Sequence, residues 1–178
     1  RYLDTIELHR GGALNFIDKM PANFLFYKFI KLALPGSKFI HTYRNPWDNA
    51  ISLFKANYQD TIIYASSFFA IATEYSNYSY LMKFWKKISK DPFLDISYEE
   101  IVSNTDVSIK KLWDYCGLEG EFSSKKRKSH YANTASQQQV SQDIYKTSLK
   151  KEEFIKFKDQ FVDDLAQQDV FWKKRQNT

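Results

Sequence analysis

The composition of the chain describes a folded protein with a modest positive charge. Its 178 residues are enough for one globular domain with a core and too few to argue for two. Hydrophobic residues make up 43% and aromatic residues 17%, which excludes a disordered chain, because such chains lack the apolar surface that offsets ordering entropy. The net charge of +5 favours anionic ligands without requiring nucleic acid, and we expect no nucleic-acid partner.

Strand and helix patterns alternate along the first part of the chain. Apolar residues at helical spacing alternate with short runs of strand-favouring residues, and Pro or Gly separates several of them. In chain order, the predicted elements are the end of a helix at Tyr2–Ile6, a buried strand at Asn15–Asp18, a helix at Phe24–Leu34, a strand at Lys38–Tyr43 and a helix at Trp47–Asn57.

The second part continues this alternation and then changes character. The stretch Ser66–Ile88 contains no Gly or Pro and predicts one long helix. A third strand at Phe93–Ser97 precedes a short helical turn and a helix at Thr105–Cys116, which Gly117 caps. Beyond Gly120 the sequence is polar and basic and predicts a long loop region, before helical spacing returns from Glu152 to Phe171.

These elements predict an α/β fold in which helices flank a parallel sheet. In such sheets ligands bind at the carboxyl ends of the strands. We therefore expect functional residues directly after the predicted strands.

Arg44 and Ser52 are the strongest candidates for binding an anion. Arg44 follows the second predicted strand, and Ser52 lies on the helix that comes next. A guanidinium offers a rigid fork of donors, the start of a helix adds partial positive charge, and a hydroxyl adds a neutral donor, so together they suit a phosphate. The alternative is a surface salt bridge from Arg44 to Asp48, with the Ser52 hydroxyl bonding its own backbone.

Two further candidates also follow predicted strands. Lys19 comes directly after the first strand, where it is either a site residue or a solvated loop lysine. Tyr98 comes directly after the third strand, where it is either a ligand contact or a core aromatic residue.

The order and spacing of several motifs resemble the sulfotransferase family, particularly its bacterial branch that is linked to tetratricopeptide repeats. The resemblance covers about Asp18 to Ser148. The segments that carry it are Phe16–Phe24, Leu34–His41, Arg44–Phe54, Ile96–Val102, Leu112–Leu118 and Thr134–Val140.

This resemblance implies a role for each matching residue. Arg44 and Ser52 would hold the 3′-phosphate of the donor 3′-phosphoadenosine 5′-phosphosulfate, and Lys19 would lie near the transferred sulfuryl group. Tyr98 would contact the adenine, and Ser136 and Gln139 would belong to a loop over the nucleotide. The family commonly has Arg where Ser141 stands. The acceptor would be a hydroxyl or an amine on a small molecule, a glycan or a peptide.

The resemblance also implies a P-loop-NTPase-like sheet, yet the sequence lacks the glycine-bearing loop that would wrap the 5′-phosphosulfate. Gly11 and Gly12 precede a predicted strand instead of following one. We therefore expect residues 1–178 to be one partial domain, the carboxy-terminal portion of a longer protein and inactive alone. The resemblance implies that a tetratricopeptide region precedes it in that protein. The alternatives are a non-catalytic nucleotide-binding or interaction domain of this fold and a P-loop kinase relative.

Several other classes of protein are disfavoured. The single cysteine, Cys116, cannot form an intrachain disulfide, and nothing else indicates an oxidising compartment, so we expect a cytoplasmic location. His9, His41 and His130 lack the spacing of metal ligands, and we expect no metal. No apolar run is long enough to predict a membrane span.

Overall fold

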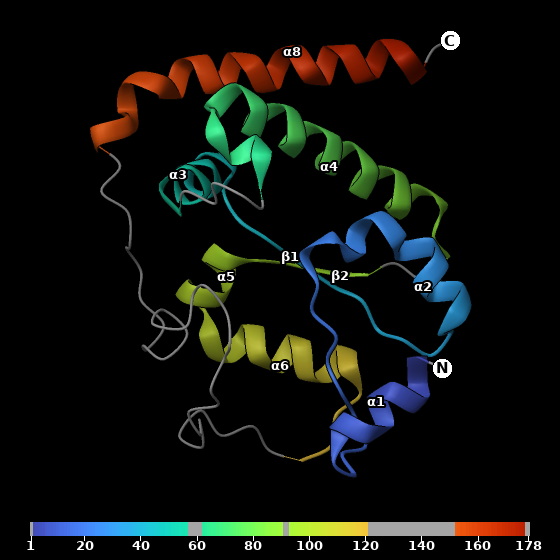
Figure 1. The fold of residues 1–178 in the computed structure, drawn as a ribbon. Coiled ribbons are helices and arrows are strands. Elements are labelled where there is room, and N and C mark those ends of the chain that lie inside the picture. The colour runs from blue at the N-terminus through green and yellow to red at the C-terminus, as the bar shows by residue number, and fades with distance from the viewer. Residues whose placement is uncertain (1, 57–61, 91–92, 121–151, 177–178) are drawn as a thin grey trace. The chain divides into compact units, whose positions relative to one another are not determined.

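The computed structural model describes residues 2–56, 62–90, 93–120 and 152–176 (Figure 1). The chain divides into two compact units, Arg1–Pro35 and Gly36–Thr178, and each is described by itself. Unit 1 contains α1 (Tyr2–Arg10), the 3-10 helix η1 (Pro21–Phe26) and α2 (Tyr27–Ala33). Unit 2 contains β1 (Ile40–Tyr43), α3 (Pro46–Ala56), η2 (Ile63–Ser66), α4 (Phe68–Ile88), β2 (Leu94–Ser97), α5 (Tyr98–Ser103), α6 (Thr105–Cys116), η4 (Glu152–Phe157) and α8 (Lys158–Gln176).

The strand predicted at Asn15–Asp18 is wrong. These residues form an irregular segment between α1 and η1, and the Ile17 side chain is 93% exposed. Asp18 instead accepts hydrogen bonds from the Tyr2 hydroxyl at 2.5 Å and from Asn23 Nδ2 at 3.4 Å. A short apolar run cannot form a strand unless a neighbouring strand pairs with its backbone groups, and periodicity does not reveal such a partner.

The helix predicted at Phe24–Leu34 is confirmed in its second half. The segment begins as the 3-10 helix η1 with Pro21 in its first turn, where the missing N–H of proline costs no intrahelical bond. It continues as α2 and ends where the Leu34 N–H donates to the Ile30 carbonyl at 2.8 Å. Pro35 then prevents a further turn.

The predicted strands at Lys38–Tyr43 and Phe93–Ser97 are confirmed, and they pair in parallel. The register of β1 and β2 runs from Ile40 opposite Leu94 to Tyr43 opposite Ser97. The chain between them contains α3 and α4, as a parallel connection requires. Figure 1 shows α4 and α8 on one side of this two-stranded sheet and α5 and α6 on the other.

The helices predicted at Trp47–Asn57, Ser66–Ile88 and Thr105–Cys116 are confirmed as α3, α4 and α6, and the helical spacing at Glu152–Phe171 falls on η4 and α8. The loop region predicted beyond Gly120 lies outside the described residues. The long helix α4 begins after Ser67, whose Oγ accepts the Ala70 N–H at 3.1 Å. At the end of α6, Gly117 adopts the left-handed conformation at φ +66°, which stops the helix at the predicted residue.

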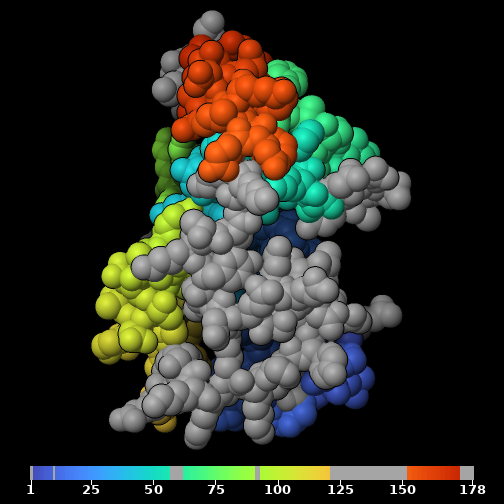
Figure 2. All heavy atoms as spheres, turned by 90° about the vertical axis from the view of Figure 1, so that its left-hand side faces the viewer, coloured from blue at the N-terminus to red at the C-terminus, as the bar shows by residue number. Residues whose placement is uncertain are grey.

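The main hydrophobic core of unit 2 lies where α3, α4 and α8 meet. Ile51, Ile71 and Phe161 contribute side chains that are at most 2% exposed, and Trp47 packs beside them. Phe154 in η4 contacts both Phe54 and Phe68. Figure 2 shows η4 and the start of α8, in orange, against α3 and the start of α4. Although α4 and α8 are long, no helix in the described residues combines the length and apolar character needed to cross a bilayer.

We expect Gly117→Ala to destabilise the protein by about 1 kcal/mol, because a side chain disfavours left-handed backbone. Gly36→Ala is the matched control: an added Cβ meets no atom within 4 Å at either glycine, but only Gly117 has a positive φ. Urea denaturation measures both free energies of unfolding. Equal losses for the two variants would contradict this account of how α6 ends.

Candidate functional site at the ends of the strands

Arg44 leaves the end of β1, and the residues after it start α3. The Asn45 side-chain Oδ1 accepts the N–H groups of Trp47 at 3.0 Å and Asp48 at 3.2 Å, while Pro46 has no N–H to donate. The Asn49 N–H donates to the Asn45 carbonyl at 2.9 Å. The first turn of α3 therefore has its backbone donors occupied, and it offers an anion the helix dipole but no free N–H.

Tyr98 begins α5 directly after β2, so the two strand ends carry Arg44 and Tyr98 side by side. Ser97 caps α5 by accepting the Glu100 N–H at 3.0 Å. The Glu99 carboxylate then accepts the Asn45 N–H at 2.9 Å, although the two residues are 54 positions apart in the chain. This bond joins the first turn of α5 to the start of α3.

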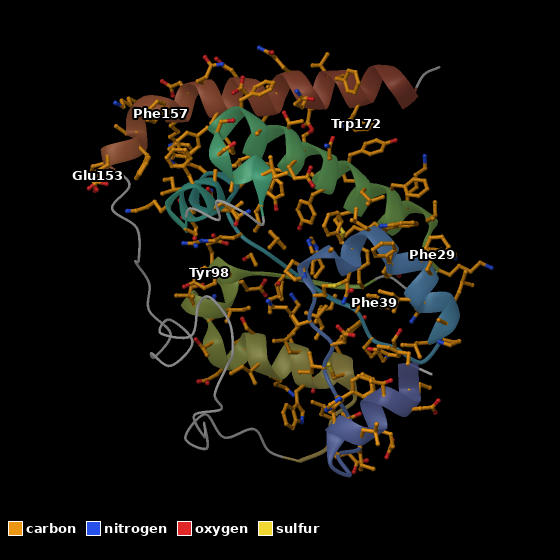
Figure 3. The ribbon with its side chains drawn as sticks, viewed as in Figure 1. Phe29, Phe39, Tyr98, Glu153, Phe157 and Trp172 are labelled. Carbon is orange, nitrogen blue, oxygen red and sulfur yellow. The ribbon has the colours of Figure 1, made fainter. Side chains whose placement is uncertain are left out.

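The Arg44 guanidinium lies over the Tyr98 ring. The guanidinium carbon is 4.9 Å from the ring centroid, a distance typical of a cation–π contact. The Nε atom of Arg44 is buried and makes no hydrogen bond to the described residues. An unpaired buried donor is costly, so this atom is available to an acceptor brought by a ligand. Figure 3 shows Tyr98 where β2 meets α5.

A cavity of about 220 Å³ opens beside this pair. It is lined by one cation, two carboxylates and three other side chains: Arg44, Asp48, Tyr98, Glu99, Val102 and Ser103. Sites for drug-sized ligands usually measure about 300–1,000 Å³, so this cavity is smaller than such sites and has room for a phosphate group.

The structure brings Arg44 and Tyr98 together, because β1 and β2 pair in parallel and each residue directly follows one of these strands. Ser52 is half-buried on α3 and does not line the cavity, but it lies one helical turn beyond Asp48, which does. Lys19 is an exposed residue of unit 1 and follows an irregular segment instead of a strand. Ser136 and Gln139 lie outside the described residues.

Two polar residues of this site, both on α5, carry no role in the sequence-based predictions. Glu99 and Ser103 both line the cavity from α5. The sequence signal that could have pointed to Glu99 is an acidic residue in the first turn of a helix that directly follows a strand. Such an acid usually pairs with its own helix terminus, so sequence gives no hint that Glu99 reaches the start of α3.

A second polar cluster lies under α4, around His41 on β1. His41 Nδ1 and Asp95 Oδ1 are 2.6 Å apart, and the two residues are opposite each other in the strand register. Lys86 forms an ion pair with Asp95, and the Tyr78 hydroxyl bonds to His41 Nε2. The four side chains use one another as partners and fasten α4 to both strands, so we assign them a structural role.

The electrostatics of this cluster follow from its contacts. Burial alone would raise the pKa of Asp95, but hydrogen bonds and charge from Lys86 and His41 outweigh it and lower that pKa. Burial raises the pKa of Tyr78 far above its usual value, and the nearby Tyr75 and Asp95 raise it further. The phenol therefore stays neutral and serves as a hydrogen-bond partner.

Comparison with known proteins identifies one family. A model described as "Sulfotransferase family" matches residues 1–123, which includes Lys19, Arg44, Ser52 and Tyr98. No curated protein matches the chain. No solved structure matches it either.

We expect Asp95→Asn to destabilise the protein by about 1.5–3 kcal/mol at pH 7, the usual contribution of a hydrogen bond to a charged group. The control is Asp114→Asn, which removes an exposed ion pair with Lys110 and should cost less than about 1 kcal/mol. Thermal unfolding monitored by circular dichroism measures both.

The effect of Asp95→Asn should depend on pH. Because folding lowers the pKa of Asp95 below its usual 3.8, its stabilisation is present above that pH and is lost as the pH falls through the folded-state value. The difference between wild type and variant should therefore shrink as the pH falls below 3.8. A difference that stays constant from pH 7 to this range would contradict the assigned ion pair.

Proposed function

Because the chain belongs to the sulfotransferase family, we propose that it serves the transfer of a sulfuryl group from 3′-phosphoadenosine 5′-phosphosulfate to a hydroxyl or amine. In this proposal Arg44 holds the 3′-phosphate of the donor. The observation that carries the proposal is the Arg44 guanidinium over the Tyr98 ring, beside a small cavity at the carboxyl ends of parallel strands.

The chemistry of Arg44 supports this role. A guanidinium stays charged at any physiological pH and presents donors in a fork that matches phosphate oxygens. Its Nε lacks a protein partner among the described residues, so a phosphate oxygen would satisfy it. The start of α3 directs the positive end of its dipole toward the same region.

Ser52 is the second proposed phosphate ligand. It shares a face of α3 with the cavity residue Asp48, because residues four apart in a helix lie one above the other. A phosphate in contact with Arg44 would need to extend along α3, past Asp48, to reach the Ser52 hydroxyl. The contact with Ser52 therefore restricts the position of the phosphate more than the contact with Arg44 does.

The remaining assignments follow the family resemblance. Tyr98 would contact the adenine, and Ser136 and Gln139 would cover the nucleotide. During transfer, the bond between sulfur and the bridging oxygen of the donor breaks while the acceptor atom forms a new bond to sulfur. Lys19 would stabilise the negative charge that develops on the bridging oxygen. The acceptor proton would pass to a base that we do not assign.

We also propose that the sheet is P-loop-NTPase-like and that this chain carries its carboxy-terminal portion. Within the family, we propose the branch that is linked to tetratricopeptide repeats. In the described residues, β1 is followed by Arg44-Asn45-Pro46 and β2 directly by α5, so neither strand leads into a glycine-rich loop. The 5′-phosphosulfate would therefore need contacts other than these two strand ends provide.

Adenosine 3′,5′-bisphosphate should raise the melting temperature of the protein more than adenosine 5′-phosphate does, because only the former engages Arg44. Arg44→Ala should weaken binding of the bisphosphate by about 1.5–3 kcal/mol in calorimetry. Lys110→Ala is the control, since it removes one exposed positive charge from a helix that does not line the cavity. Equal thermal shifts for the two nucleotides, or equal losses in both variants, would contradict the assignment.

The 178-residue chain should bind the bisphosphate without measurable turnover of the sulfuryl donor, since no glycine-rich loop is available to hold the reacting group. Release of adenosine 3′,5′-bisphosphate from the donor, followed with phenolic and amine acceptors, measures this. Efficient turnover would show that other residues hold the 5′-phosphosulfate. Binding without turnover in every longer form of the chain would favour the alternative of a non-catalytic nucleotide-binding domain.

A further inference from the structure

We propose that Glu99 is a positioning residue for Arg44. Its carboxylate holds the peptide that follows Arg44, and this contact keeps the guanidinium over the Tyr98 ring and beside the cavity. The inference rests on the proposed function, because it assumes that Arg44 binds the 3′-phosphate.

The hydrogen bond acts at the right point of the backbone. Glu99 Oε1 accepts the Asn45 N–H at 2.9 Å, and this N–H belongs to the peptide that joins Arg44 to Asn45. A hydrogen bond to that peptide restrains the ψ torsion of Arg44 and so limits how the Cα that carries the side chain can turn relative to Asn45 and α3. The same peptide leads into the Asn45 side chain that caps α3, so one contact orients the arginine and the helix together.

The first turn of α5 contacts the Arg44 region twice. Tyr98 supplies the ring under the guanidinium at 4.9 Å, and the next residue, Glu99, supplies the acceptor for the peptide. Neither contact alone determines where the guanidinium lies. A ring permits a cation to slide across its face, and a fixed peptide permits several rotamers. Together they restrict both ends of the Arg44 side chain.

This turn is itself anchored to α6. The fully buried Ser108 donates from Oγ to the Glu100 carbonyl at 3.2 Å. Lys111 Nζ donates to Glu100 Oε1 at 3.1 Å and forms an ion pair with it. Glu99 therefore projects from a helical turn that Ser108 and Lys111 hold in place, as a positioning residue requires.

Because Glu99 is charged, its proposed positioning role can be distinguished experimentally from a purely electrostatic role. Glu99 lines the proposed phosphate cavity, where its negative charge opposes an incoming anion. If charge were its only contribution, removing it would strengthen binding. The Asn45 N–H needs only an acceptor oxygen, which a glutamine retains without the charge.

The experiment measures binding of adenosine 3′,5′-bisphosphate and adenosine 5′-phosphate to the 178-residue chain by calorimetry. Glu99→Ala should weaken binding of the bisphosphate about tenfold, equivalent to about 1.4 kcal/mol. It should change binding of the 5′-phosphate less than about twofold, because that ligand does not engage Arg44. Glu99→Gln should bind the bisphosphate at least as tightly as wild type. Glu99→Asp keeps the charge but shortens the reach, so it should resemble Glu99→Ala.

A double-mutant cycle with Arg44→Ala tests whether Glu99 acts through the arginine. In the Arg44→Ala background, Glu99→Ala should have no further effect beyond about twofold, because the group being positioned is already gone. Additive losses would overturn the inference. Stronger binding by both Glu99→Ala and Glu99→Gln would also overturn it, as would an equal loss for both nucleotides in Glu99→Ala.

The two proposals fail in distinguishable ways. If Arg44→Ala leaves the preference for the bisphosphate unchanged, both the proposed function and the role of Glu99 are overturned. If Arg44→Ala removes that preference while Glu99→Ala and Glu99→Asp retain it, only the role of Glu99 is overturned. Should Glu99→Ala fail to fold, the contrast between Glu99→Gln and Glu99→Asp decides: equal affinities in these two variants would overturn the inference.

Discussion

The parallel pairing of β1 and β2 is the constraint on which the candidate site depends. Parallel strands end at the same edge of a sheet, so the residues that follow them become neighbours whatever their separation in the chain. Arg44 and Tyr98 meet for this reason, and Asn45 and Glu99 bond across 54 positions. Under α4, the opposed pair His41 and Asp95 links the same two strands through their side chains.

The candidate site lacks the backbone donors of the usual phosphate site at a helix start. There, free backbone N–H groups contact the anion directly, and side chains add to them. In α3 the Asn45 side chain occupies the N–H groups of Trp47 and Asp48, and Pro46 has none. An anion must therefore rely on side-chain donors, chiefly Arg44. In the proposed function, this dependence would make the orientation of the Arg44 guanidinium decisive, and residues that do not touch the ligand would then affect its binding.

The sequence predicted the elements that local patterns determine and missed the contacts that tertiary structure creates. The long helix α4 and the end of α6 at Gly117 follow from spacing and capping, and the structure confirms them. The prediction of a strand at Asn15–Asp18 was wrong because an apolar run does not show whether another strand pairs with it. The contacts of His41 and Glu99 were not predicted, because their partners lie on other elements, 37 to 54 positions away.

The long connection between the two strands has a consequence for folding. Each contact between the two strand ends closes a loop of the chain that contains α3 and α4. The chain loses conformational entropy when this loop closes, and this loss opposes the stabilisation that the contact provides. Local structure in α5 or α3 can form early, but the arginine and its aromatic neighbour meet only after the whole connection has docked. Nucleotide binding would thus report on the completed topology of unit 2, and a partly folded chain with intact helices would lack it.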